Sequence, residues 1–429
     1  MPKNPNGPCI EKGVWTPLPT APPAVTNVVF APVLAGSGFM FHIAGCAGDP
    51  INSGPGLAVA SGMAAQITDS GKGPAVAPSF LYHLGDITYS EKGHDVTPEM
   101  WNTQFYKQYA GYAQEHTPLP IFAIAGNHDG KTGSTTAASQ ITHFLQNMCG
   151  TAGKVSPDNT ADPARMETAQ PYVYFRLDTP LAYIIGLYTN VSNGGVLDDP
   201  QHGPFKKGPQ YQWLVEQLTF CRKHKAAGQA VLLALHYPPY NGAVDFAQRG
   251  NPTFGNDNAY PDAVPVAMVL EAAYQDSGQI PDAVFSAHAH LYQRMTVSYA
   301  DDKGKAVRQV PHFVVGCGGH SPIELMASTC EGGVATFPTK PFDLFKQGNP
   351  PVNLTAPPNA TVTVEASADG VDKEKVPFGF LRVTVTTGSQ PKLVCEFFTT
   401  VCDSTGKPVQ AGSVLADSCV VDLTTHLLS

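Results

Sequence analysis

Short apolar runs alternate along the chain with longer segments of helical character. Five continuous apolar runs are typical of buried strands: residues 39–44 (FMFHIA), 80–84 (FLYHL), 121–125 (IFAIA), 231–235 (VLLAL) and 283–286 (AVFS). Three segments have the composition or the apolar spacing of helices: residues 57–68, 100–114 and 209–225. This alternation of strands and helices predicts an α/β fold.

The rest of the chain differs from this alternating pattern. Residues 1–36 are Pro-rich and aperiodic, which predicts an extended N-terminal arm, and residues 37–429 are predicted to form a single domain. Strand pairs are predicted at 172–177 with 182–187 and at 378–386 with 392–401, the latter closing a second sheet. Loop insertions are predicted at about 130–170 (with a short helix at 143–148), 241–261 and 321–377.

Polar side chains follow each of the five buried strands where the strand ends. They are Cys46, then Asp86 and Tyr89, then Asn127 and His128, then His236, and finally His288 and His290. Ligands of α/β sheets bind at the carboxyl edge of the strands, so these side chains are expected to lie together. Such oxygen and nitrogen donors suit one or two ions of Fe, Zn or Mn. A shared carboxylate and a bridging hydroxide would allow two ions to hydrolyse a phosphate ester.

Composition excludes several classes of protein. Lys+Arg 26 against Asp+Glu 35 gives a net charge of −9, and no basic cluster is present, so neither a nucleic-acid partner nor an anionic membrane is expected. Residues 1–20 contain no apolar core of a signal peptide, and no run approaches the roughly 20 apolar residues of a membrane span. Low Lys and Glu with abundant Ala, Gly, Thr and Pro favours an exported protein, periplasmic or secreted.

The nine cysteines form an odd set, so at least one is unpaired within the chain. No CxxC pair is present, which argues against a structural zinc knuckle. Cys46 lies at the predicted edge of the metal site and is the cysteine expected to stay unpaired.

Four motifs occur in order at the strand ends: GDITY (85–89), GNHD (126–129), HYPPY (236–240) and AHAHLYQR (287–294). Together they resemble the calcineurin-like metallophosphoesterases, and the Tyr three residues after the Asp resembles the purple acid phosphatase branch. The resemblance covers about 39–294, with GCGGH (316–320) as a Gly-rich turn near the metals and 378–398 as closing strands. It implies a four-layer α/β/β/α sandwich of two mixed sheets.

The resemblance also implies roles for individual residues. The implied metal ligands are Asp86 as the bridge, Tyr89 and His290 for Fe(III), and Asn127, His236 and His288 for Fe(II), Zn or Mn. His128 would contact the phosphate beside Asn127 and protonate the leaving oxygen, and Asp129 would orient His128. The implied reaction is hydrolysis of a small phosphomonoester by a metal-bound hydroxide.

Departures from the family pattern leave alternatives open. Cys46 occupies the position of a ligating Asp, so the first metal would be bound by the Cys46 thiolate or by Asp49, or its site is weakened; Asp49 is slightly favoured. Ala287 replaces a Gly before the His-x-His motif, and Asp245 replaces a family His.

Two other functions remain open. A phosphodiesterase or nucleotidase would use the same metals, with Tyr240 and Phe254 as candidates to stack on a base. A catalytically impaired phosphate-binding or sensor protein is suggested by the missing first-strand Asp. His320 is a further candidate for substrate binding because the Gly-rich turn precedes it. The oligomeric state is not predicted.

Overall fold

The computed structural model describes most of the chain. The described residues are 22–32, 34, 38–70, 77–90, 96–129, 138–150, 153–160, 164–166, 168–189, 207–240, 266–321, 342–343, 360–368, 376–403, 407–408 and 412–429. The predicted insertion at 241–261 lies outside these residues, as does most of the one at 321–377.

Two mixed sheets form the centre of the protein. The larger sheet has the order β1 (Asn27–Val29), β7 (Phe175–Asp178), β8 (Ala182–Gly186), β9 (Ala230–Ala234), β10 (Ala283–Ser286), β12 (Ala306–Val315), β11 (Tyr292–Ala300), β14 (Ala360–Ala368) and β13 (Phe342–Asp343). The smaller sheet has the order β17 (Val414–Asp422), β16 (Lys392–Cys402), β15 (Val376–Thr386), β2 (Gly38–Ala44), β3 (Pro78–His83) and β6 (Ile121–Ala123). A short hairpin, β4 (Ala113–Gln114) with β5 (Thr117–Pro118), lies apart from both.

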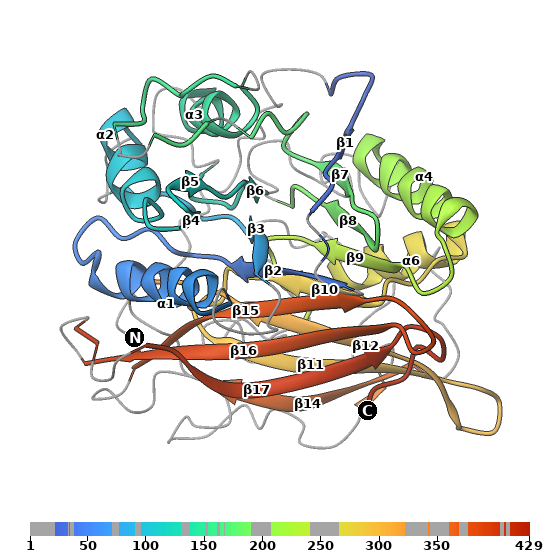
Figure 1. Ribbon diagram of the computed structural model, residues 1–429. Helices are drawn as coiled ribbons and strands as arrows, with labels where there is room; N and C mark the ends of the chain where they lie inside the picture. The colour runs from blue at the N-terminus through green and yellow to red at the C-terminus, as the bar shows by residue number, and fades with distance from the viewer. Residues whose placement is uncertain are drawn as a thin grey trace, which may run out of the picture.

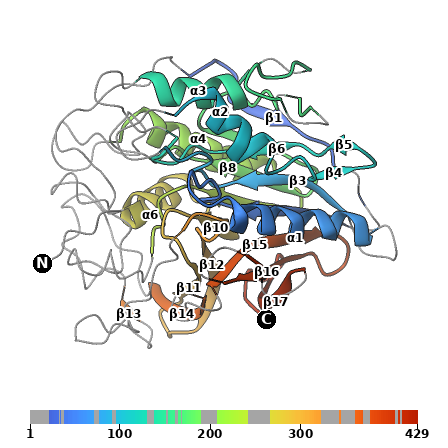
Figure 2. The ribbon, with the colours of Figure 1, turned by 90° about the vertical axis from the view of Figure 1, so that its left-hand side faces the viewer.

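Helices lie on the outer sides of the two sheets. Helix α1 (Gly54–Ser70) packs on β15 and β16, whereas α4 (Pro209–His224) packs on β8 and on α6 (Val266–Ser277). Figures 1 and 2 show α1 on the opposite side of the protein from α4 and α6. Helices α2 (Pro98–Trp101) and α3 (Ala138–Met148) complete the described helical segments, together with the π-helix η1 (Asn102–Tyr106). The predicted four-layer α/β sandwich of two mixed sheets is confirmed.

Parallel strands bring the predicted ligand loops to one edge. Strand β2 pairs parallel with β3, which pairs parallel with β6, and β9 pairs parallel with β10 in the other sheet. All seven residues of β2 are buried, which explains why its sequence is continuously apolar rather than alternating. Phe41 and Phe80 stack with their ring centroids 4.7 Å apart, and Phe80 meets Phe122 edge-on at 5.6 Å. This aromatic packing fixes the three strands that are followed by Cys46, Asp86 and Asn127.

Several segments differ from their sequence predictions. Residues 27–29 lie in the predicted N-terminal arm, yet they form β1 and pair parallel with β7. Residues 360–368 lie in a predicted loop, yet they form β14, whose ATVTVEASA sequence pairs antiparallel with β11. The predicted helix at 100–114 is only partly present, because α2 gives way to η1 and residues 113–114 form a strand. Long-range pairing therefore ordered segments whose local pattern was weak.

A partly buried ion pair joins the two sheets. Arg294 on β11 donates two hydrogen bonds to Asp417 on β17, with N···O distances of 2.8 and 3.0 Å. The Tyr292 hydroxyl donates a third hydrogen bond to Asp417 at 2.6 Å, and its ring stacks on Phe397 with centroids 3.6 Å apart. Burial would raise the pKa of Asp417, but the hydrogen bonds from Arg294 and Tyr292 outweigh it and lower that pKa.

Replacing Asp417 is expected to weaken the contact between the sheets. Asp417→Asn should lower the free energy of unfolding at pH 7 by about 2 kcal/mol, because Arg294 loses its charged partner. Since the folded pKa of Asp417 lies below its unfolded value, its contribution is present above about pH 4 and is lost as the pH falls through the folded pKa. The difference between wild type and variant in urea unfolding should therefore shrink on acidification. The exposed Asp302→Asn is the control, and equal stability of wild type and Asp417→Asn at pH 7 would contradict the expectation.

Candidate metal centre

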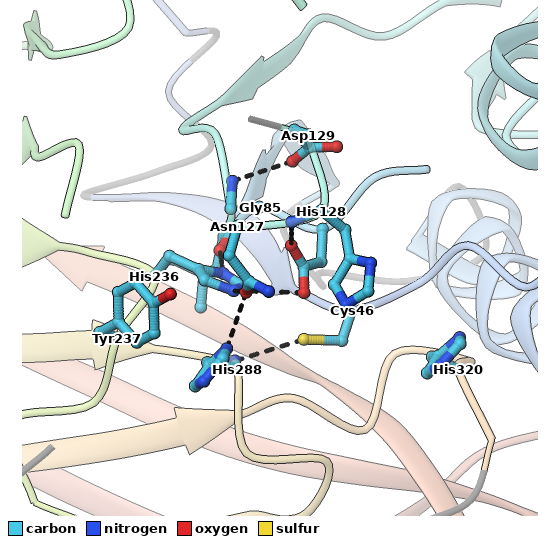
Figure 3. Close-up of polar contacts among 12 residues, drawn as sticks. Cys46, Gly85, Asn127, His128, Asp129, His236, Tyr237, His288 and His320 are labelled. Carbon is cyan, nitrogen blue, oxygen red and sulfur yellow. Dashed lines mark hydrogen bonds and ion pairs between the residues drawn. The ribbon is translucent and has the colours of Figure 1, made fainter. Parts of the chain in front are cut away.

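The loops that follow five strands meet at one edge of the protein. Figure 3 shows Asn127, His236 and His288 pointing toward one another, with the Cys46 sulfur beside His288. The predicted ligands Asp86, Tyr89 and His290 are linked to the same group by the contacts described below. The structure therefore brings together seven of the eight residues predicted as metal ligands: Cys46, Asp86, Tyr89, Asn127, His236, His288 and His290.

The backbone at these strand ends adopts an uncommon conformation. Cys46 and Asp86 both have φ of 53°, and His288 has φ of 64°, in the left-handed region that non-glycine residues rarely occupy. Gly126 is required beside them, because a Cβ at that position would collide with the Asp86 carboxylate. Ala287, which replaces a family Gly, is not among the residues with positive φ. Strained backbone of this kind typically clusters at functional sites.

The Asp86 carboxylate lies at the centre of the group. Its Oδ1 accepts the His128 backbone N–H at 2.8 Å, and its Oδ2 accepts the Tyr89 hydroxyl at 3.0 Å. Its Oδ2 also lies 3.3 Å from His236 Nε2. Burial would raise the pKa of Asp86, but the charges of His236 and His128 outweigh it and hold that pKa well below its usual range. Asp86 is therefore ionised at neutral pH although it is 1% exposed.

His236 directs a ring nitrogen at two oxygens. Its Nδ1 lies 2.8 Å from the Leu84 carbonyl oxygen, which can only accept, so this nitrogen carries the hydrogen. Its Nε2 lies 3.0 Å from Asn127 Oδ1 and 3.3 Å from Asp86 Oδ2. In a neutral ring, Nε2 would direct a lone pair at the Asn127 and Asp86 oxygens, which repel it. A positive charge between Nε2 and these oxygens, either a proton or a metal ion, removes this repulsion. Burial would lower the pKa of His236, but Asp86 outweighs it and raises that pKa.

The two histidines of the AHAHLYQR motif contact different partners. His288 Nδ1 lies 2.9 Å from Asn127 Oδ1, and His290 Nε2 lies 3.2 Å from the Tyr89 hydroxyl. Burial lowers the pKa of both rings well below its usual value, with neighbouring histidines adding to the effect. Both are therefore neutral imidazoles, the form that binds metal ions.

The two candidates for the first-strand ligand lie in different places. Cys46 is fully buried in the cluster, and its Sγ accepts the His288 backbone N–H at 3.3 Å. Asp49 lies farther along the loop, where one oxygen accepts the backbone N–H groups of Ile51 and Asn52 and the other accepts that of Ser321. The geometry therefore brings Cys46 rather than Asp49 to the metal ligands.

Aromatic rings stack along one side of the cluster. Tyr89 lies between His320, whose ring is parallel to it at 3.6 Å, and His128, whose ring centroid is 4.3 Å away. His320 Nδ1 lies 2.9 Å from the Gly48 carbonyl oxygen, and burial lowers the pKa of His320 to about 4. Both imidazoles are partly exposed, so they flank the cluster where a substrate would approach.

Two predicted site residues contact partners other than the predicted ligands' side chains. Asp129 accepts the backbone N–H groups of Ile87, Thr88 and Gly126, so its contacts position the two ligand loops (Figure 3). Tyr240 is 2% exposed and packs with its ring centroid 5.0 Å from that of His312. Phe254 and Asp245 lie outside the described residues.

Gln104 is a residue of the site that the sequence did not indicate. Its side chain accepts the Tyr89 N–H and donates to the Tyr89 carbonyl, both at 2.8 Å, and so fixes the backbone of a predicted ligand. Gln104 lies in the π-helix η1, a type of turn that is frequent at functional sites. A glutamine within a predicted helix belongs to no motif. The π-helical irregularity that marks Gln104 is visible only in the structure.

The chemistry of the cluster fits a bound metal ion. Cys46, Asp86 and His236 each place a donor atom within 4.8 Å of the others, and all three are buried. Thiolate, carboxylate and imidazole donors suit transition metals, and the ionised Asp86 supplies negative charge in a buried site. Of the described residues, these three form the group of His, Cys, Asp and Glu side chains that meets this spacing.

Comparison with known proteins identifies the family. The family model described as calcineurin-like phosphoesterase matches residues 65–292, more than half of the 429 residues. The chain therefore belongs to the calcineurin-like phosphoesterase family, whose reaction is hydrolysis of phosphate esters at a metal site.

One solved structure shares this fold at low sequence identity. The structure of PhoD is 14% identical with a TM-score of 0.50, over 93% of this chain and 72% of that chain. GAP50, described as the anchor in the inner membrane complex of Plasmodium, is 14% identical with a TM-score of 0.46, over 89% of this chain and 90% of that chain. A search of curated proteins finds no match. Within the described residues, no helix has the length and apolarity to span a membrane.

Replacing the Asp86 carboxylate should remove the metal while preserving the fold. Asn tolerates the left-handed φ of Asp86 and retains its shape, so Asp86→Asn should fold yet lose the charge that binds the ions. Wild type expressed with ample metal is expected to contain about two ions per chain, and Asp86→Asn fewer than one, by elemental analysis. Asp49→Asn, whose contacts are to backbone amides, should retain the wild-type content. Full metal content in Asp86→Asn would refute a ligand role for Asp86.

Proposed function

We propose that this protein hydrolyses phosphomonoesters in the manner of an acid phosphatase of the purple acid phosphatase branch. The observation that supports this most directly is the ionised, buried Asp86 surrounded by imidazole and amide donors, with two partly exposed histidines beside it. When bound, metal ions lower the pKa of water to give a nucleophile and neutralise charge on the phosphoryl oxygens. The proposed ions are Fe(III) with Fe(II), Zn or Mn.

The proposed ligands divide into two groups around Asp86. Tyr89 and His290, whose Oη and Nε2 lie 3.2 Å apart, would hold one ion. Asn127, His236 and His288, linked by contacts of 2.9 and 3.0 Å, would hold the other. Asp86 contacts members of both groups and would therefore bridge the two ions.

His128 is the proposed acid of the reaction. Its backbone N–H is fixed by Asp86, and its partly exposed ring lies beside Tyr89, at the edge of the cluster. From there the ring would bind a phosphoryl oxygen and donate a proton to the leaving oxygen. His320, on the other face of Tyr89, would contact the substrate as well. Asp129 would act by holding the loops that carry Asp86 and Asn127, through its backbone hydrogen bonds.

A monoester is preferred over a nucleotide substrate because of Tyr240. The nucleotidase alternative used Tyr240 to stack on a base, but its ring is 2% exposed and packed beside His312. A phosphodiesterase acting at the same metals remains the second candidate, since its reaction needs the same ligands.

A substrate panel separates these functions. The metal-loaded protein should hydrolyse p-nitrophenyl phosphate with a higher kcat/KM than bis(p-nitrophenyl) phosphate or nucleotides. His128→Asn should lower kcat on p-nitrophenyl phosphate by about 10²- to 10⁴-fold with unchanged metal content, because a proton donor is lost. The exposed His116→Asn is the control, since it makes the same exchange away from the cluster and Asn tolerates the positive φ of His116.

Each alternative function has its own outcome in this panel. Preference for the bis ester would favour the phosphodiesterase. No turnover of any ester by a fully metal-loaded protein would overturn the proposal and favour a phosphate-binding or sensor protein.

A further inference from the structure

We propose that Cys46 binds metal as a thiolate, and that the site beside it therefore selects a thiophilic divalent ion of the Zn²⁺ class over hard ions such as Mn²⁺ or Mg²⁺. This inference rests on the proposed function only in assuming that the cluster binds metal.

The backbone aims the Cys46 side chain into the cluster. The Cys46 N–H donates to the Gly85 carbonyl at 3.0 Å, and its own carbonyl accepts the His320 N–H at 2.9 Å. These bonds hold the residue from both sides in its left-handed conformation, with φ of 53°. Its sulfur then lies within 4.8 Å of donor atoms of both Asp86 and His236, in a fully buried position. A conformation this costly is expected to be retained where the side chain has a specific task.

The sulfur lies beside a hydrogen-bond donor and a carboxylate. The His288 backbone N–H donates to Sγ at 3.3 Å, and such a donor stabilises a thiolate more than a thiol. Tyr89 also interacts with Cys46, and its hydroxyl donates to Asp86 Oδ2 at 3.0 Å. Sulfur and carboxylate thus gather in one buried place beside the Tyr89 hydroxyl, where a cation would compensate the negative charge of a thiolate and a carboxylate.

A second buried cysteine near the same edge provides a contrast. Cys317 is fully buried, its carbonyl accepts the Gly379 N–H, and burial raises the pKa of its thiol to about 12. Cys317 is not part of the described donor group formed by Cys46, Asp86 and His236. It is therefore a packing residue and a matched control for Cys46.

Asp49 does not supply a hard oxygen ligand in place of the soft Cys46 sulfur. Both oxygens of Asp49 accept backbone N–H groups, as described above, and one lies 3.7 Å from His320 Nδ1. A thiolate binds Zn²⁺, Co²⁺ and Cd²⁺ more strongly than it binds Mn²⁺ or Mg²⁺.

Spectroscopy of the metal-substituted protein tests the inference without measuring hydrolysis. Metal-free full-length protein is titrated with Co²⁺ and, separately, Cd²⁺, and the ultraviolet absorption is followed. Thiolate-to-metal charge transfer should give an intense band in wild type and in Cys317→Ser, but not in Cys46→Ser or Cys46→Asp. Cd²⁺ affinity relative to Mn²⁺ should fall by about tenfold or more in Cys46→Asp. Circular dichroism establishes which variants are folded, and Asp tolerates the left-handed φ well.

Three results would overturn the inference. If wild type binds ions stoichiometrically without the charge-transfer band, Cys46 is not a ligand, although the proposed function survives. If the band persists in a folded Cys46→Asp protein, another cysteine is the ligand. If wild type binds no metal at all, both the inference and the proposed function fail.

Discussion

The functional edge of this protein depends on one buried negative charge, the Asp86 carboxylate. It is 1% exposed, and its two oxygens contact the backbone of His128, the hydroxyl of Tyr89 and the ring of His236. An ionised group at such depth is stable only with positive charge close by. The neighbouring rings supply part of it, and the lone pair of His236 faces oxygens where a cation would lie. Electrostatics therefore requires a cation at this edge, a proton or a metal ion, and family membership favours the metal ion.

The fold supplies the geometry that this charge requires. Parallel pairing of β2, β3 and β6 in one sheet and of β9 and β10 in the other directs five loops to one edge. Asp129 and Gln104 then fix the loops through hydrogen bonds to backbone groups, and Gly126 leaves room for the carboxylate. At this edge three residues adopt the unfavourable left-handed backbone conformation: Cys46, Asp86 and His288. Stability comes from elsewhere, including the contact of Arg294 and Tyr292 with Asp417 between the sheets.

Much of this could be predicted from the sequence, because the signals are local. Continuous apolar strands ending in Asp86, Asn127, His236 and His288 predicted an α/β fold and the edge where these residues meet, and the family resemblance of the motifs implied the sandwich. What the sequence did not predict depends on long-range contacts. Strand β14 exists because it pairs with β11, and β1 because it pairs with β7. Tyr240 follows His236 closely in sequence, yet it packs in the core. The choice between Cys46 and Asp49 as a ligand depended on the backbone conformation of the loop after β2.

The central claim is that Asp86 and Cys46 share a metal centre with the histidines of the other strand ends. A crystal structure of the zinc-loaded protein, with anomalous scattering measured at the metal edge, tests it most directly. Anomalous peaks are expected on either side of the Asp86 carboxylate, one of them bonded to the Cys46 sulfur. Peaks absent from this edge, or bonded to Asp49 with the Cys46 sulfur turned away, would contradict the claim.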